Sequence, residues 1–310
     1  MVIRETRENR FRKLKRNWAR QWQWYVLLLP AVVYLFFFNY LPMYGLQIAF
    51  RNYRVSKGIW GSDWVGLKYF KQFVSFSNFK MIMRNTAGIS LYSLATFPLA
   101  VILALLLNEL RNVKFKKTVQ MITYAPHFIS VVVICSMLRL FFARSNGIFN
   151  NILEMLGGSR VAFLESSRYF ASMYVWSGVW QNIGFNTIIY ISALSGVSPE
   201  LHEAARIDGA SRFQVMTHVN LPGIMPTIII TLILRCGSIL SVGFEKVYLM
   251  QNSLNLDAST VISTYVYEIG LRNAQYSYSA AIGLFNTLIN VVFLCIVNMI
   301  SKRTTRISLW

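Results

Sequence analysis

"EAARIDGASRFQVMTHVNLP", residues 203–222, is a polar, helix-favouring segment in a chain that is otherwise mostly apolar. Four charged residues lie within its first ten positions: Glu203, Arg206, Asp208 and Arg212. The stretches before and after it are among the most hydrophobic of the protein. What the segment does therefore depends on what these apolar stretches are.

The composition excludes an ordinary soluble domain. The chain has 310 residues, of which 55% are hydrophobic and 14% are charged, and its mean hydropathy is +0.44. Soluble domains carry about 25% charged residues. The net charge of +19 would suggest nucleic acid for a soluble protein. Here the basic residues border the apolar runs, so we expect contact with membrane lipid and none with nucleic acid.

Long runs without charge predict the fold class. Asp, Glu, Lys and Arg are absent from residues 21–50, 85–108, 118–138, 169–199, 213–234 and 273–301. A helix needs about 20 mostly apolar residues to cross a bilayer core. We predict an all-α polytopic membrane protein with six transmembrane helices, at 24–46, 86–107, 119–142, 169–196, 223–244 and 280–300. A large soluble helical core would instead need amphipathic helices, and these runs are apolar all round.

The basic residues predict the orientation. The side that would hold both termini carries 17 Lys and Arg and the other side carries 12, which places the termini in the cytoplasm. The apolar run after the basic start is too long for a signal peptide and lacks a cleavage site, so we expect an uncleaved first span. The predicted segments are a basic cytoplasmic segment 1–23, a first transmembrane helix 24–50, an extracytoplasmic loop 51–85, a membrane core 86–300 and a cytoplasmic tail 301–310. The loop is amphipathic in "GLKYFKQF", which favours the membrane surface.

Familiar catalytic patterns are absent from the sequence. No Gly is followed by Lys, so there is no Walker A phosphate loop, and neither HExxH nor Gly-x-Ser-x-Gly occurs. The predicted spans carry no acid/base pair of the kind that marks proton-coupled carriers. The cysteines, Cys135, Cys236 and Cys295, lack motif spacing and are expected to pack in the spans. We therefore expect no catalytic residue, no metal site and no directly bound cofactor.

Local signals in the 198–221 loop predict two helices joined by a corner. Ser198 suits an N-cap and Pro199 the first helical position. Three apolar residues and an acid then share one helix face: Leu201, Ala204, Ala205 and Asp208. Gly209 is expected to end this helix, residues 210–219 to form a second one, and residues 221–222 to break the chain. A solvated loop does not need this shape, whereas a docking surface for a partner does.

The same residues resemble a known family. Glu203-Ala204-Ala205, three residues, Gly209, nine residues and Val219-x-Leu221-Pro222 is similar to the cytoplasmic loop motif of binding-protein-dependent ABC importer permeases, with Val in place of the usual Ile. The six-span layout and the missing ATPase motif also fit. The resemblance implies a type I ABC importer permease-like bundle in which 199–217 is the coupling helix. Its coupling residues would be Glu203, Ala204, Ala205, Asp208, Gly209, Leu221 and Pro222.

The resemblance also implies partners. ATP and Mg²⁺ would be bound by a separate cytoplasmic ABC ATPase dimer, whose closure moves the coupling helices. A second permease subunit, more typically different than identical, and an extracytoplasmic solute-binding protein would complete the complex in a bacterial cytoplasmic membrane. "LLPAVVYLFFFNYLPMYGLQIAF", "VGFEKVYLM" and "RTTRISLW" resemble the carbohydrate branch, in particular permeases for oligosaccharides or polysaccharide fragments.

Polar residues in the spans are candidates for the substrate path. Asn182, Asn186 and Tyr190 recur every four residues on one helical face, and sugar sites combine amides with aromatic rings. The full candidate set is Trp180, Asn182, Asn186, Tyr190, Arg235, Ser238, Asn286 and Asn290. Interfacial tryptophans and asparagines that bond neighbouring helices are the alternative interpretation. Import of a phosphodiester, polyamine or peptide, and a membrane scaffold that moves no solute, also remain open.

Overall fold

The computed structural model describes residues 7–310, with side chains from residue 21 onward. Residues 1–6 of the predicted basic segment 1–23 lie outside the described residues. The chain divides after Leu67 into two compact units, which are described separately below. Both units are built mainly of helices.

The first unit contains one long helix followed by a hairpin. The helix comprises α1 (Arg7–Leu35), a π-helical segment (Phe36–Tyr40), α2 (Leu41–Met43) and a 3-10 helix (Tyr44–Phe50). Its part from Gln21 to Phe50 is long and apolar enough to cross a membrane, which agrees with the first predicted span. Strands β1 (Arg51–Arg54) and β2 (Gly58–Trp64) then pair antiparallel, with Arg51 opposite Trp64.

The hairpin is a small departure from the expected all-α architecture. Arg51 holds it together, because its guanidinium lies 5.4 Å from the ring centre of Trp60 and 5.6 Å from that of Trp64. The same side chain donates a hydrogen bond to the carbonyl of Ser62 at 3.0 Å. Two tryptophans of β2 and a planar cation from β1 thus favour a β-ribbon in a segment that was predicted only as a loop.

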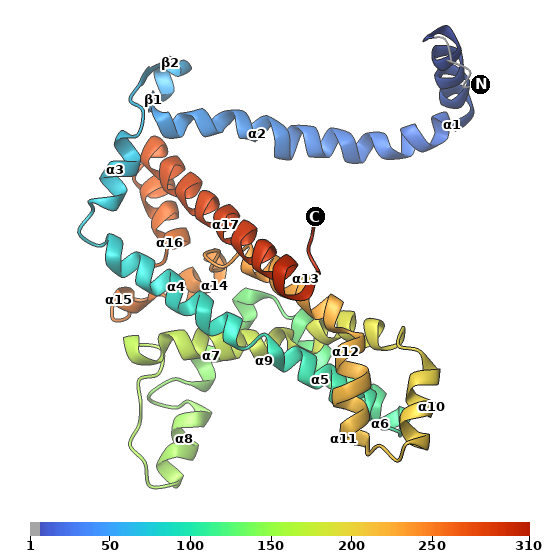
Figure 1. Ribbon diagram of the computed structural model, residues 1–310. Coiled ribbons are helices and arrows are strands. Elements are labelled where there is room, and N and C mark those ends of the chain that lie inside the picture. Colours follow the sequence, from blue (N-terminus) through green and yellow to red (C-terminus); the bar gives the residue numbers. More distant parts are fainter. Residues whose placement is uncertain (1–6) are drawn as a thin grey trace. The chain divides into compact units, whose positions relative to one another are not determined.

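The second unit is all-helical and contains the remaining elements (Figure 1). In chain order these are α3 (Lys68–Val74), α4 (Phe79–Ala95), α5 (Pro98–Asn108), α6 (Val113–Tyr124), α7 (Val131–Phe141), α8 (Ile148–Met155), α9 (Ser167–Leu194), α10 (Pro199–Ile207), α11 (Arg212–Val215), α12 (Leu221–Gly223), α13 (Met225–Cys236), α14 (Phe244–Met250), α15 (Leu256–Ser259), α16 (Ile262–Tyr267) and α17 (Tyr276–Thr305).

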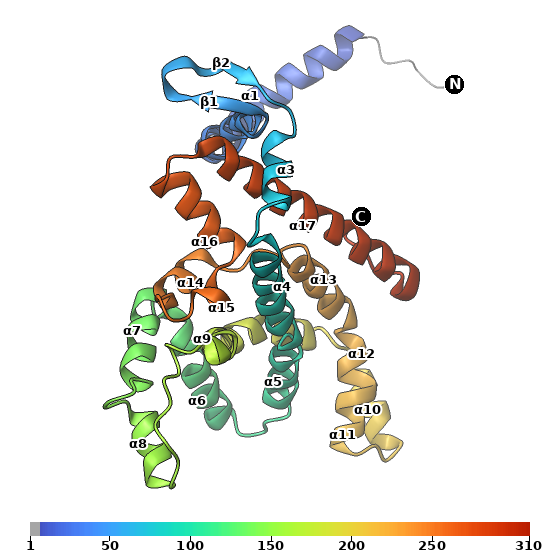
Figure 2. The same ribbon diagram turned by 90° about the vertical axis from the view of Figure 1, so that its left-hand side faces the viewer.

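Helix α9 runs through the middle of this unit. It packs against α4, α5, α6 and α13, as both views show (Figure 2). Gly184 permits the contact with α6, since a Cβ at this position would lie 2.2 Å from the carbonyl oxygen of Thr123. Helices α10 and α11 lie at one end of the unit, and α8 and α15 lie at the other (Figure 1).

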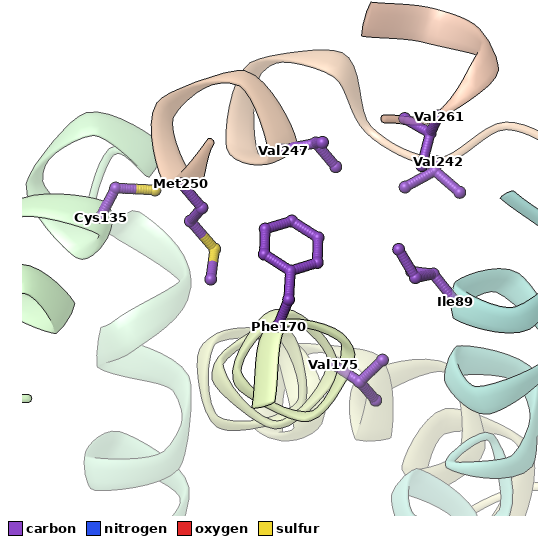
Figure 3. Packing of buried hydrophobic residues seen from close by; sticks show 8 residues of the cluster. All are labelled: Ile89, Cys135, Phe170, Val175, Val242, Val247, Met250 and Val261. Atoms are coloured by element: carbon purple, nitrogen blue, oxygen red, sulfur yellow. The ribbon is translucent and has the colours of Figure 1, made fainter. Parts of the chain in front are cut away.

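A buried apolar cluster joins α9 to the elements at the α15 end. Phe170 of α9 is 1% exposed and points toward Val247 of α14, between Met250 and Ile89 (Figure 3). Cys135 packs in the same cluster as a free thiol, as predicted. The cluster therefore fixes α14 against α4, α7 and α9.

The structure supports fewer single spans than the six predicted. Three helices of 30 residues are long and apolar enough to cross a membrane: Gln21–Phe50, Phe79–Asn108 and Tyr276–Thr305. They correspond to the first, second and sixth predictions, although the second begins before residue 86. Two bent pairs would raise the number to five. Helix α9 lies within two residues of the predicted bounds 169–196. It is not among these three helices, because its amides and aromatic residues lower its hydropathy.

The third predicted span, 119–142, is broken rather than continuous. Helices α6 and α7 meet at an angle of 100°. Pro126 at the break lacks an N–H donor, and Ser130 starts α7 by accepting a hydrogen bond from the amide of Val133 at 3.4 Å. Gln181 of α9 donates to the carbonyl of Ile129 at 3.0 Å, so a residue distant in sequence satisfies the interrupted backbone.

The fifth predicted span, 223–244, is also corrected, because helix α13 ends at Cys236. The chain then turns, and two distant side chains satisfy the backbone of the turn. Asn290 of α17 accepts a hydrogen bond from the amide of Leu240 at 2.9 Å, and the hydroxyl of Tyr174 accepts one from the amide of Gly243 at 3.1 Å. Irregular backbone within a membrane protein needs such protein partners.

Candidate functional site

The polar segment between α9 and α13 folds as two short helices joined at a glycine corner. Ser198 caps α10 by accepting a hydrogen bond from the amide of Glu200 at 3.3 Å, and Pro199 occupies its first turn. Helix α10 ends at Ile207, and Gly209 has a φ of +78°, a conformation that residues with a Cβ rarely adopt. The predicted cap and corner are both confirmed.

The second helix begins with a capping box and continues further than predicted. The Ser211 hydroxyl accepts a hydrogen bond from the amide of Gln214 at 3.3 Å, and the Gln214 side chain accepts one from the amide of Ser211 at 2.7 Å. The predicted break at 221–222 is wrong, because a 60° bend comes at Ile224 instead. Pro222 lies in the first turn of α12, where its missing N–H is tolerated.

A polar network that the sequence did not predict anchors both helices. His202 Nε2 of α10 lies 2.7 Å from Asn220 Oδ1, and Asn220 is 1% exposed. Asn220 donates to a carboxylate oxygen of Glu109 at 3.4 Å, and Arg212 forms an ion pair with Glu109 at 3.3 Å. Glu109 caps the C-terminus of α5, so α10, α11 and α5 are tied together. The position of Glu109 directly after a charge-free run was its only signal.

The α10–α11 segment carries large apolar side chains that are exposed in this chain. Ile207 is 86% exposed, Phe213 is 68% exposed and Leu201 is 55% exposed. The predicted coupling residues Glu203, Ala204, Asp208, Gly209 and Pro222 are also exposed, whereas Ala205 is half-buried. Leu221 is half-buried against an apolar cluster that includes Ile224. Exposed large apolar residues beside charged ones are typical of a protein-binding surface.

Three of the predicted path residues line one cavity. Asn182 and Asn186 of α9 and Arg235 of α13 face a space of about 390 Å³ between α4, α5, α9, α13 and α14. Arg235 donates hydrogen bonds to the carbonyl and hydroxyl oxygens of Ser93, at 3.3 Å and 3.2 Å. The structure thus brings residues from three distant segments to one polar site.

Arg235 also lines two neighbouring cavities. One of about 810 Å³ is shared with Tyr190, whose hydroxyl lies 3.0 Å from the hydroxyl of Thr231. The other, of about 180 Å³, is shared with Ser238. Arg235 therefore lies where three spaces within the helical unit adjoin.

The other candidates lie elsewhere. Trp180 is 47% exposed and faces a separate apolar hollow that it shares with Trp176. Asn290 holds the turn after α13 and donates to the hydroxyl of Ser241 at 3.1 Å. Asn286 has a buried side-chain oxygen without a hydrogen-bond partner among the described residues. None of these three lines the cavities that contain Arg235.

Lys246 lines the 390 Å³ cavity and was not predicted as a site residue. It belongs to α14 and is only 9% exposed, and its ammonium donates to the carbonyl of Tyr174 at 2.9 Å. The ammonium also lies 5.0 Å from the ring centre of Tyr174. Burial lowers the pKa of Lys246 from its ordinary 10.5 to about 8. In the sequence, nothing distinguishes Lys246 from other charged residues that follow a predicted span.

The described residues contain no cluster of three or more His, Cys, Asp or Glu side chains that could hold a metal ion. Cys236 is buried and Cys295 is exposed, and both are free thiols. The lining of the 390 Å³ cavity offers amide groups and two cations, Arg235 and Lys246.

Known proteins resemble this chain over most of its length. Residues 96–306 match the family described as "Binding-protein-dependent transport system inner membrane component". Protein LplB of Bacillus subtilis (strain 168) is 43% identical over 280 residues, which cover 90% of this chain and 88% of LplB. The polygalacturonan/rhamnogalacturonan transport system permease protein YteP of the same organism is 39% identical over 280 residues, covering 90% and 87%.

A solved structure has the same fold. A chain of a bacterial ABC transporter involved in the import of the acidic polysaccharide alginate superposes with a TM-score of 0.87 at 37% identity. The match covers 94% of this chain and 99% of the other. A second structure of the alginate transporter, in complex with a periplasmic protein that holds an alginate pentasaccharide, matches with a TM-score of 0.87 at 36% identity.

Proposed function

The chain belongs to the family of binding-protein-dependent transport system inner membrane components, whose members are transport permeases and not enzymes, and we propose that it is the permease subunit of an ATP-driven oligosaccharide importer. The single observation that carries the proposal is the network of hydrogen bonds that connects the exposed α10–α11 segment to α5, a helix that lines the polar cavities. Both the surface and the cavity belong to one connected helical unit.

The α10–α11 segment is the proposed docking surface for a cytoplasmic ABC ATPase. Ile207 and Phe213 would enter an apolar cleft of the ATPase, and Glu203 would add polar contacts at its edge. The glycine corner at Gly209 sets the angle between the two helices. ATP and Mg²⁺ belong to that partner, since this sequence contains no phosphate-binding loop.

The polar network would transmit movement of the docked segment. A displacement of α10 acts on Asn220 through His202, and Asn220 and Arg212 act on Glu109 at the end of α5. Helix α5 lines the 390 Å³ and 810 Å³ cavities through Ala100. This chain of hydrogen bonds would connect the ATPase side to the cavity walls and so couple docking to alternation between inward- and outward-facing states.

The substrate class follows from the relatives and from the cavity. YteP is named for polygalacturonan and rhamnogalacturonan transport, and the alginate transporter imports a polysaccharide. The cavity offers amides at Gln181, Asn182 and Asn186, of the kind that bind sugar hydroxyls. A scaffold that moves no solute would not need polar cavities inside the helical unit.

The proposed assembly contains an ATPase dimer, a second permease subunit and a solute-binding protein. The alginate transporter was solved with its periplasmic protein, which supports a solute-binding partner here. We propose a heterodimer of permeases in the bacterial cytoplasmic membrane, with both termini and α10 on the cytoplasmic side. The basic residue count and the location of α10 opposite α8 and α15 support this orientation.

The test is purification of the tagged chain from native membranes in mild detergent, followed by an ATPase assay. The proposal expects ATPase activity and a second permease to copurify with the wild type. Glu203→Lys and Gly209→Pro should lose the ATPase, while the exposed Glu165→Lys on the α8 side should retain it. An ATPase that remains bound to both loop variants would refute the docking surface.

A further inference from the structure

The 390 Å³ cavity has a charge that transport of neutral sugars does not require. Lys246 and Arg235 both line it, one from α14 and the other from α13. None of its lining residues carries a carboxylate, and neither do those of the two adjoining cavities. Glu245, the acid beside Lys246 in sequence, is exposed and lines none of the three. The site is therefore cationic.

Neither cation is neutralised within the described chain. The hydrogen-bond partners of Lys246 and Arg235 are oxygens of Tyr174 and Ser93, which are neutral. The salt bridges in residues 21–310 lie at other sites. Lys246 is buried and Arg235 is half-buried. Removing a cation from water without an anionic partner is unfavourable, so these two cations at one cavity indicate an anionic occupant.

The donors are suited to carboxylates. The Lys246 ammonium has three N–H groups, of which Tyr174 takes one. Arg235 uses one guanidinium nitrogen on Ser93, and its other nitrogens have no hydrogen-bond partner among the described residues. Charged hydrogen bonds to a carboxylate are stronger than those to a neutral hydroxyl. The volume of about 390 Å³ lies in the range of small-molecule sites, roughly 300–1,000 Å³.

We propose, building on the proposed oligosaccharide importer, that this cavity selects oligosaccharides that carry carboxylates, with Lys246 and Arg235 as the specificity-determining residues. The amides of α9 bind sugar hydroxyls, while the two cations bind the carboxylates of uronic acid units. A neutral sugar of the same size leaves both cations without a charged partner and binds more weakly.

The experiment compares acids with their esters. The complex purified from native membranes is placed in lipid nanodiscs, and equilibrium binding is measured for trigalacturonate, trimannuronate and the full methyl ester of each. Acid and ester have the same sugar units and hydroxyls, and the ester differs by a methyl group on each carboxyl that removes its charge. We expect at least one acid to bind about tenfold more tightly than its ester, because hydrogen bonds to charged groups are the stronger ones.

Variants locate the selectivity. Lys246→Met keeps the length of the side chain and removes its charge. In the double variant Lys246→Met/Arg235→Gln, the ratio of the affinity for the acid to that for its ester should fall near one. Lys246→Arg should keep the preference for the acid, and Lys80→Met, an exposed lysine on α4, should leave the ratio unchanged. Copurification of the ATPase with each variant checks that the complex is assembled.

Two outcomes overturn the inference but leave the importer standing. One is equal binding of acid and ester by the wild type, and the other is a preference for acid that survives in the double variant. Loss of binding to all four probes and to maltotriose, in a preparation without ATPase activity, would overturn the proposed function itself.

Discussion

Replacing Lys246 with Met should stabilise the protein at neutral pH. The pKa of Lys246 is lowered by burial from 10.5 to about 8, and each pKa unit corresponds to about 1.4 kcal/mol. The charged side chain therefore destabilises the fold by about 3 kcal/mol at pH 7. The lost hydrogen bond to Tyr174 offsets about 1 kcal/mol of the gain. The expected net stabilisation is about 2 kcal/mol.

The effect of Lys246→Met on stability should depend on pH. Between pH 8 and 10.5 the unfolded chain holds a proton on Lys246 that the folded chain has released, so stability of the wild type rises with pH in this window. The destabilisation is complete below pH 8 and falls to less than about 1 kcal/mol at pH 10. The advantage of Lys246→Met should therefore disappear as the pH rises.

The assay is thermal unfolding of the wild type and Lys246→Met in nanodiscs at pH 7 and pH 10, at one scan rate. A change of 1 kcal/mol shifts Tm by roughly 2–4 °C in domains of 150–250 residues, so we expect a rise of roughly 4–8 °C at pH 7. Lys80→Met, which changes an exposed lysine, is the control at both pH values. A lower Tm for Lys246→Met at pH 7, or a gain that persists at pH 10, would show that burial of the charge is not the governing effect.

Three further predictions concern the loop and the turn after α13. Gly209→Ala should destabilise the corner by about 1–2 kcal/mol, because φ is +78° while the added Cβ meets no neighbour; the observable is a weaker ATPase interaction in the pull-down. His202→Leu should leave the ATPase bound but lower solute uptake per ATP hydrolysed, measured in proteoliposomes, because α10 loses Asn220. Asn290→Leu should lower Tm, since the amide of Leu240 would lose its partner at a cost of about 1–3 kcal/mol; an unchanged Tm would contradict the role given to that bond.

The sequence by itself determined the features that arise from neighbouring residues. Charge-free runs were enough to predict a membrane protein, and the bounds of α9 came within two residues at each end. The cap at Ser198 and the corner at Gly209 were also predictable, because hydrogen bonds to adjacent amides and the freedom of φ depend on local chemistry. The loop motif identified the family by resemblance, because its residues lie within twenty positions of one another in the sequence.

Only the tertiary structure decided where the helices break and which polar residues meet. The breaks in the third and fifth predicted spans persist because Gln181 and Asn290, from other helices, satisfy backbone groups that would otherwise be orphaned. Asn286 and Asn290 have the same sequence character as Asn182, but only Asn182 reaches the cavity. Lys246 joins Asn182 there because α14 packs on α9 through Phe170, a contact between distant segments that local periodicity does not encode.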